Sequence, residues 1–220
     1  MVDQKRSRAA KAAHKLRRLL GRERELWADG LTRVAGVDEV GVGPLAGPLV
    51  AAAVIFPPEV GLTGVDDSKK LSPTRREALE GQIQASALSW SVIAVDPEEI
   101  DRLNIYQAGL VAMRRALLAL DPAPEWVLVD GRGQVPELPY RQECVIGGDG
   151  LCHAIAAGSI LAKCERDRLM TAYDETFPGY GFAAHKGYPT VKHRDAIRRL
   201  GPTPIHRRSF NLLPEGRLSD

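Results

Sequence analysis

A short apolar segment that runs into two adjacent carboxylates places the strongest constraint on how this chain folds. Residues 34–37 read as a buried strand, and Asp38 and Glu39 follow them directly. An ionised carboxylate is costly to bury unless it is paired or bound to a metal ion. Because successive strand side chains point to opposite faces, the two acids share one site only if the strand ends, twists or bulges there. A solvent-exposed pair without a chemical role is the alternative.

Two further acids occupy positions that can meet this pair. Asp130 follows the apolar segment 126–129, and Asp149 lies between two glycines. Four carboxylates at strand ends and in a glycine-rich loop can converge on one edge of a sheet, and such oxygen ligands suit Mg²⁺ or Mn²⁺ rather than zinc. Two such ions would support hydrolysis of a phosphodiester. A glycosidase acid and base is the alternative; it is disfavoured because only 5% of the residues are Phe, Trp or Tyr.

Apolar patterns along the chain alternate between strand and helix periods. The expected strands are residues 34–37, 49–56, 90–95, 126–129 and 142–146. One expected helix begins at Pro73, with Ser72 as its cap. The others cover residues 107–120, 153–173 and 190–200. The first two strands are joined by a short turn containing Gly and Pro, which predicts a hairpin. The pattern indicates an α/β fold with a mixed five-stranded sheet flanked by helices.

The net charge of +2 conceals an uneven distribution. Residues 1–24 carry nine Lys or Arg against two acids, and residues 185–208 are also basic. Polyanions are attracted to basic surfaces, and carboxylates that accept a polyanion need cations between them, so the arrangement suits a nuclease. Solvated surface charge is the alternative. We expect three segments: a basic N-terminal extension (1–30), a catalytic domain (31–177) and a C-terminal helical and loop region that binds substrate (178–220).

The sequence gives no sign of export or membrane insertion. No segment reaches the roughly 18 apolar residues of a membrane span, and the N-terminus lacks the apolar stretch of a secretory signal. The three cysteines, Cys144, Cys152 and Cys164, are odd in number and form no Cys-x-x-Cys pair. This argues against a disulfide framework and against a zinc site. We therefore expect a cytoplasmic protein without membrane contact.

The glycines that follow the acidic pair form the segment Gly41-Val42-Gly43-Pro44. They lead into a strand rather than a helix, so the segment does not match a dinucleotide-binding loop. Glycines allow the main chain to approach a ligand closely, and main-chain groups can then reach a sugar hydroxyl. A simple turn without a ligand is equally compatible with the spacing.

Several segments, taken together and in order, resemble the ribonuclease HII family. They are residues 35–48 with the acids and glycines, 67–72 (Asp-Ser-Lys-Lys-Leu-Ser), 127–131, Gly148-Asp149, 157–167, 179–182, 185–190 (His-Lys-Gly-Tyr-Pro-Thr) and 206–210. The resemblance covers about residues 33–210. It implies a ribonuclease H-like fold with a small C-terminal helical part.

The resemblance also implies an activity and a set of site residues. The substrates would be RNA/DNA hybrids and duplex DNA containing ribonucleotides, with incision 5′ of the ribonucleotide to leave a 3′-hydroxyl and a 5′-phosphate. Two Mg²⁺ or Mn²⁺ ions, both touched by Asp38, would be held by Asp38, Glu39, Asp130 and Asp149. Gly41, Val42, Gly43 and Tyr188 would recognise the ribose 2′-hydroxyl, and Lys69, Lys70, Ser159 and Lys163 would contact phosphates or support the site.

One residue departs from the family pattern, because Val42 stands where the family normally has Arg. If main-chain groups read the 2′-hydroxyl, selectivity for ribonucleotides is kept, whereas the contact of a guanidinium with phosphate is lost. We therefore expect weaker substrate affinity with unchanged selectivity.

Two other interpretations stay open. One is a nucleic-acid-binding module whose acids are structural; the other is a different member of the same superfamily, such as a ribonuclease HIII-like enzyme or a recombinase. Tyr188 in its Gly-Tyr-Pro loop favours ribonuclease HII, and the basic segment is too short for the additional N-terminal domain expected of ribonuclease HIII. We expect the protein to be a monomer.

Overall fold

A mixed five-stranded sheet forms the centre of the computed structural model, which describes residues 2–214. The strands are β1 (Val34–Val40), β2 (Leu49–Ile55), β3 (Ser89–Val95), β4 (Trp126–Asp130) and β5 (Arg141–Val145), in the order β3-β2-β1-β4-β5. β1, β2 and β3 pair antiparallel, whereas β4 and β5 are parallel to β1. The predicted α/β class, the β1–β2 hairpin and the five strands are confirmed.

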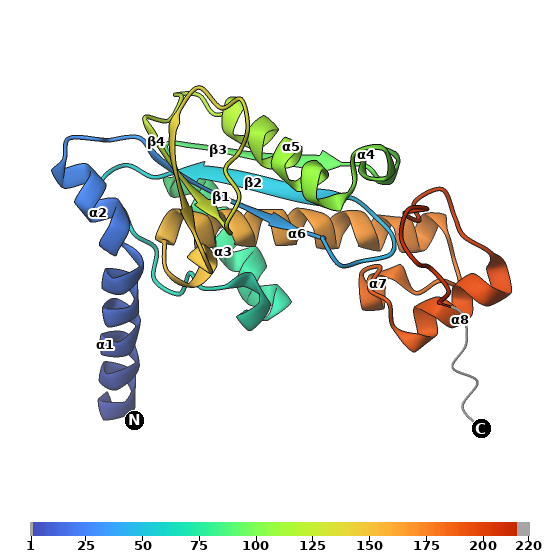
Figure 1. The fold of residues 1–220 in the computed structure, drawn as a ribbon. Coiled ribbons are helices and arrows are strands. Elements are labelled where there is room, and N and C mark those ends of the chain that lie inside the picture. Colours follow the sequence, from blue (N-terminus) through green and yellow to red (C-terminus); the bar gives the residue numbers. More distant parts are fainter. Residues whose placement is uncertain (1, 215–220) are drawn as a thin grey trace.

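Helices cover both faces of this sheet. They are α1 (Val2–Leu19), α2 (Gly21–Ala28), α3 (Pro73–Ser86), α4 (Pro97–Leu103), α5 (Ile105–Leu118), α6 (His153–Thr176), α7 (Phe182–His185) and α8 (Val191–Leu200), with 3₁₀ turns η1 (Ser68–Lys70) and η2 (Gly148–Gly150). Figure 1 shows α5 on one face and α6 on the other, with α1 and α2 at one end and α7 and α8 at the opposite end. Ser72 caps α3 as predicted, whereas α4 and α7 were not predicted.

The alternation of side chains along β1 separates two apolar cores. Ala35 and Val37 pack with α5, whereas Val40 packs with α6 and α3. By the same alternation, Asp38 lies on the α6 face of the sheet and Glu39 on the α5 face. The next strand, β2, is buried along its whole length, which explains its uninterrupted apolar sequence.

Two glycines allow α6 to approach the sheet closely. A Cβ atom at Gly36 in β1 would lie 2.2 Å from the amide nitrogen of Ile155, and one at Gly158 in α6 would lie 2.7 Å from the carbonyl oxygen of Ala52. Both obstacles are backbone atoms, which cannot rotate away. The close approach places Ser159, the residue after Gly158, against β1 near Asp38.

The chain that follows α6 packs on the far end of this helix. Its apolar side chains, among them Phe182 and Ile197, form a separate core with Met170 of α6 and with Leu45 of the loop between β1 and β2. At the other end, α2 buries Leu26 and Glu23 against the body of the protein.

The expected division at residues 30 and 177 stays a prediction. Residue 1 of the expected extension and residues 215–220 of the expected C-terminal region lie outside the described residues.

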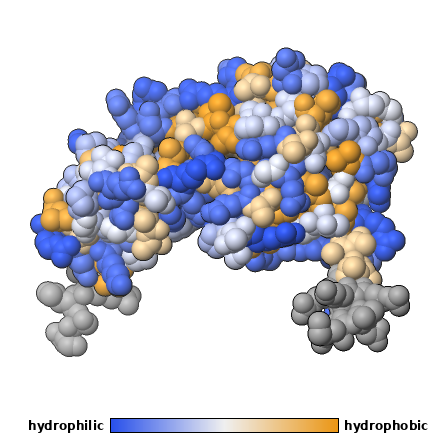
Figure 2. Space-filling model, turned by 180° about the vertical axis from the view of Figure 1, so that it is seen from behind, coloured by the Kyte–Doolittle hydropathy of each residue, from blue (hydrophilic) through white to orange (hydrophobic). Residues whose placement is uncertain are grey.

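The surface opposite to that seen in Figure 1 is mixed in character. Figure 2 shows hydrophobic patches separated by hydrophilic side chains over this face. Among the described residues, no helix combines the length and the apolar character needed to cross a membrane.

We expect Gly158→Ala to lower the free energy of unfolding by about 1–3 kcal/mol, because the added methyl group meets the backbone of β2. Urea unfolding measures the change. The matched control is Gly81→Ala in α3, where no atom lies within 4 Å of the new Cβ. There the substitution should instead raise stability by about 0.5–1 kcal/mol, the usual gain for Ala in a helix interior. Equal effects at the two positions would contradict the close packing of α6.

Candidate active site

Asp38 and Glu39 lie at the point where β1 extends past its neighbour β4. The pairing with β4 ends at Val37, which faces Val129, whereas the pairing with β2 continues to Val40. One side of β1 is therefore open at the two acids. The sequence analysis expected a strand end, twist or bulge at the two acids. Instead the pairing of β1 with β2 continues regularly through both acids to Val40, and only the side of β1 that faces β4 is open there.

Asp38 is a buried carboxylate with few groups to stabilise its charge. It is 6% exposed, and one of its oxygens accepts the amide of Glu39 at 2.7 Å. Burial raises the pKa of Asp38 well above its usual range, and the negative charges of Glu39 and Asp130 add to the effect. The hydroxyl of Ser159 and the Glu39 amide offset only part of it.

Glu39 is held in a similarly unfavourable environment on the other face of β1. Burial, followed by repulsion from Asp130, raises the pKa of Glu39 to about 7. Its Oε2 atom is buried without a hydrogen-bond partner among the described residues. Lys69 is a nearby cation that favours the ionised form.

Asp130 and Asp149 complete the acidic group through a direct hydrogen bond between their segments. Asp130 is the last residue of β4, and its Oδ1 accepts the amide of Gly148 at 2.7 Å. Gly148 begins η2, the turn that contains Asp149. Burial raises the pKa of Asp149, and the charges of Asp67 and Asp130 raise it further.

Asp67 is an additional acid at this edge that the sequence analysis missed. It caps η1 by accepting the amide of Lys69 at 2.9 Å, and it forms an ion pair with Lys70 at 3.3 Å. Burial alone would raise the pKa of Asp67, but these contacts lower it. Its negative charge lies close enough to Asp149 to raise the pKa of that residue, so η1 and η2 are neighbours.

The four predicted acids form an electrostatically connected group that fits divalent cations. Among the described residues, no three acidic, His or Cys side chains already surround a common point at coordinating distance. The raised pKa values and the unpartnered oxygen of Glu39 nevertheless mark a place where positive charge is missing. Carboxylate oxygens without competing Cys or His ligands are the donors that Mg²⁺ and Mn²⁺ prefer.

The glycine turn after β1 is fixed from behind by Arg207, whose side chain is completely buried. Its guanidinium donates to the carbonyl oxygens of Gly47 (3.0 Å), Val42 (3.1 Å) and Gly41 (2.6 Å). The Val42 side chain itself points away from this contact and is 45% exposed. Only main-chain groups of the turn are thus held by Arg207.

A second buried guanidinium, that of Arg166 in α6, supports the same loop. It donates to the carbonyl oxygens of Pro48 (2.9 Å), Ala46 (3.2 Å) and Lys186 (3.0 Å). Gly41 has a φ of +100°, and a Cβ there would lie 2.5 Å from Nε of Arg166, so glycine is required at this position. Arg166 and Arg207 stand in the resembling segments, but the sequence alone assigned them no role.

Tyr188 lies beside the glycine turn. A Cβ at Gly43 would be 3.7 Å from a ring carbon of Tyr188, and the tyrosine side chain is 43% exposed. The predicted sugar-reading group, Gly41, Val42, Gly43 and Tyr188, is therefore brought together at one surface.

Of the four remaining predicted residues, three lie beside the acids and one lies further along α6. Lys69 and Lys70 are exposed on η1. Ser159 is buried between Asp38 and Ser68, with its hydroxyl 3.0 Å from that of Ser68. Lys163, one turn further along α6, is engaged in an ion pair with Asp167 at 2.5 Å.

Comparisons with known proteins agree on one family. The family model for Ribonuclease HII matches residues 35–213. The Ribonuclease HII of Anaeromyxobacter sp. is 55% identical over 201 residues, which are 91% of this chain and 64% of that protein. The chain thus spans less than two thirds of that relative. The Ribonuclease HII of Moorella thermoacetica is 54% identical over 188 residues, which are 86% of this chain and 91% of that protein.

A solved structure gives the same result for the fold. The crystal structure of the ribonuclease H2 from Pyrococcus horikoshii OT3 superposes with a TM-score of 0.70 at 27% sequence identity, covering 82% of this chain and 94% of that one.

We expect Glu39→Gln to raise the free energy of unfolding at pH 8 by about 1–3 kcal/mol when divalent ions are absent. The pKa of Glu39 is about 7 in the folded chain against an ordinary 4.5. At pH 4 the side chain is protonated in both states, so the substitution has little effect. As the pH rises from 4.5 through 7, the wild type alone loses stability. Urea unfolding at the two pH values measures this.

Adding Mn²⁺ at pH 8 should reduce the advantage of the variant, because a bound cation favours the ionised carboxylate of the wild type. The control is Glu25→Gln in α2, whose side chain is 67% exposed and which should change stability by less than about 0.5 kcal/mol. Equal stability of wild type and Glu39→Gln at pH 8 would contradict the unfavourable environment of Glu39.

Proposed function

The chain belongs to the ribonuclease HII family, and we propose that it is a metal-dependent endonuclease acting on RNA joined to or paired with DNA. Its substrates are RNA/DNA hybrids and duplex DNA with embedded ribonucleotides, which it incises on the 5′ side of the ribonucleotide to leave a 3′-hydroxyl and a 5′-phosphate. The observation that carries the proposal is the open edge of β1, where buried acids adjoin a rigid glycine turn.

We assign Asp38, Glu39, Asp130 and Asp149 to the binding of two Mg²⁺ or Mn²⁺ ions. When bound, such ions activate the attacking water and stabilise the leaving oxygen of the phosphodiester. The chain's own contribution is positioning. The Gly148 amide orients Asp130, and the Glu39 amide and the Ser159 hydroxyl orient Asp38.

Selectivity for ribose is assigned to the turn Gly41–Gly43 and to Tyr188. Arg207 and Arg166 fix the main chain of this turn, so its polar groups can be presented to a 2′-hydroxyl without rearrangement. The exposed ring of Tyr188 offers a surface on which the neighbouring sugar can pack. Lys69 and Lys70, exposed at the same edge, are assigned to phosphates.

The remaining parts of the proposal concern the setting of the enzyme. We assign it to the reducing cytoplasm, which its free cysteines, Cys144, Cys152 and Cys164, support. The expected monomeric state stays a prediction.

The decisive experiment is incubation of the protein with a duplex containing one ribonucleotide, and with an RNA/DNA hybrid, in Mg²⁺ or Mn²⁺. We expect incision 5′ of the ribonucleotide and a loss of more than about 100-fold in rate for Asp38→Asn, because even partners outside a metal's ligand set contribute 10- to 100-fold. Gel analysis of the end-labelled products measures both.

Asp29→Asn is the matched control, since it makes the same chemical change at an exposed position beyond the opposite end of β1. It should cleave like the wild type. Duplex binding without strand scission would instead support the nucleic-acid-binding module, and an equally active Asp38→Asn would overturn the site assignment.

Val42→Arg tests how the ribose is recognised. The Val42 carbonyl is held by Arg207 while its side chain is exposed, so an arginine can be accommodated without disturbing the turn. We expect tighter substrate binding, by about tenfold, from a new contact with phosphate, and an unchanged preference for ribonucleotide over deoxyribonucleotide. Cleavage kinetics on matched ribo and deoxy duplexes measure both quantities. A preference that shifts as much as the affinity would show that the turn does not read the sugar through its main chain.

A further inference from the structure

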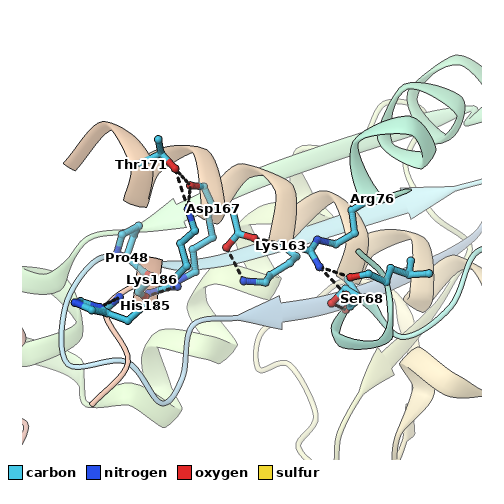
Figure 3. A network of polar contacts seen from close by, with 12 residues as sticks. Pro48, Ser68, Arg76, Lys163, Asp167, Thr171, His185 and Lys186 are labelled. Atoms are coloured by element: carbon cyan, nitrogen blue, oxygen red, sulfur yellow. Dashed lines mark hydrogen bonds and ion pairs between the residues drawn. The ribbon is translucent and has the colours of Figure 1, made fainter. Parts of the chain in front are cut away.

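A hollow of about 900 Å³ lies between α3, α6 and α7, next to the candidate active site. Among its lining residues are Arg76, Lys163, Asp167 and Lys186. Lys163 was expected to contact a phosphate or to support the site, whereas the other three had no expected role. Figure 3 shows how these side chains are joined in one polar network along α6.

Asp167 is the centre of this network. Its carboxylate accepts Nη2 of Arg76 at 3.0 Å and Nζ of Lys163 at 2.5 Å. Its main-chain oxygen accepts Nζ of Lys186 at 3.1 Å, and the same ammonium donates to the hydroxyl of Thr171 at 2.8 Å. Asp167 thus holds Arg76 and Lys163 through its carboxylate and Lys186 through its main-chain oxygen.

Positive charge is in excess at this point. Burial lowers the pKa of Lys186, and the nearby cations Lys163 and Arg166 lower it further, although Asp167 acts in the opposite direction. The other charged residues that line the hollow are Glu77, Arg168 and Glu175. Of these, Arg168 is already paired with Glu80 and Glu165. Glu77 and Glu175 are exposed. The unneutralised charge therefore lies at the end of the hollow that contains Lys163 and Lys186.

The lysines at this end of the hollow lie close along the chain to both parts of the candidate active site. Ser159, which contacts Asp38, lies one helical turn before Lys163, a separation of about 6 Å along the helix axis. Lys186 precedes Tyr188 by two residues, and its carbonyl oxygen is held by Arg166. Successive phosphates of one strand advance by about 3.4 Å along a duplex, so a phosphate one or two nucleotides from the acids can reach these ammonium groups.

We propose that Lys163 and Lys186 bind a backbone phosphate of the nucleic acid one or two nucleotides from the cleaved bond, and that Asp167 holds both ammonium groups in place before substrate arrives, Lys163 through its carboxylate and Lys186 through its main-chain oxygen. The inference rests on the proposed function. Asp167 and Arg76 are positioning residues here, since Arg76 also donates to the carbonyl oxygens of Ser68 and Leu71 and so ties η1 to the same network.

The test measures binding rather than cleavage. Lys186→Asn removes the ammonium group, and asparagine tolerates the left-handed backbone of this position, where φ is +51°. Binding to a duplex with one ribonucleotide, and to the same duplex made only of DNA, is followed by fluorescence anisotropy in EDTA over a range of salt concentrations. We expect about fivefold to tenfold weaker binding at low salt. The slope of log K against log salt should fall by about 0.9, the amount expected for one lost phosphate contact.

Three further variants complete the experiment. Lys186→Arg keeps the charge and should bind like the wild type. Arg141→Gln removes one exposed cation at the start of β5, the end of the sheet opposite the acids, and should leave the slope unchanged. If Lys186→Asn does not fold, as judged by thermal melting, Lys163→Gln on α6 provides the same measurement at an ordinary helical position.

The outcomes separate this inference from the proposed function. Equal losses on the ribo and the DNA duplex support a phosphate contact. An unchanged salt slope would overturn the phosphate contact. A loss of binding confined to the ribo duplex would also overturn it, because it would mean that Lys186 acts through Tyr188. A wild type that cleaves while Lys186→Asn and Lys163→Gln bind normally refutes only the phosphate site. A wild type that neither binds nor cleaves refutes the proposed function, and this inference with it.

Discussion

The close contact between α6 and the sheet is the constraint on which the candidate active site depends. It exists because Gly36 and Gly158 carry no side chain, so that backbone meets backbone. At this separation Ser159 reaches Asp38, and two turns further along α6 Asp167 accepts Arg76 of α3 and Arg166 donates to the loop after β1. A shift of α6 would therefore move the acid-binding hydroxyl, the lysine network and the support of the glycine turn together.

The glycine turn has no regular secondary structure, and its shape is imposed by two buried guanidiniums. Arg166 comes from α6 and Arg207 from the last described segment of the chain, and together they accept no bond but donate six, all to carbonyl oxygens. Burial lowers the pKa of Arg207 to about 9 and that of Arg166 to about 10. Such charges are tolerated only because the carbonyl dipoles satisfy them. The C-terminal segment that carries Arg207 therefore helps to fix the shape of the glycine turn.

The sequence predicted the features that depend on local pattern. The β1–β2 hairpin, the cap at Ser72 and the placement of Asp38, Glu39 and Asp130 beside strand ends all follow from neighbouring residues. It did not predict contacts between distant residues. Arg207 binds Gly41 across 166 positions, and Asp67 approaches Asp149 through the folding of two short turns. The role of Gly36 could not be predicted from its neighbours in the sequence, because it depends on the contact with α6, which is distant in the chain.

Two neighbouring regions of the site carry unbalanced charge of opposite sign. Burial and neighbouring negative charge raise the pKa values of Asp38 and Glu39 on β1, while burial and the nearby cations Lys163 and Arg166 lower the pKa of Lys186. Both arrangements cost stability in the free protein. On the proposed function, divalent cations would relieve the first region and a phosphate backbone the second. Cations and phosphates bound together at the right spacing would therefore be held more favourably than cations or phosphates alone. This is the electrostatic arrangement expected of an enzyme that cuts a polyanion with metal ions.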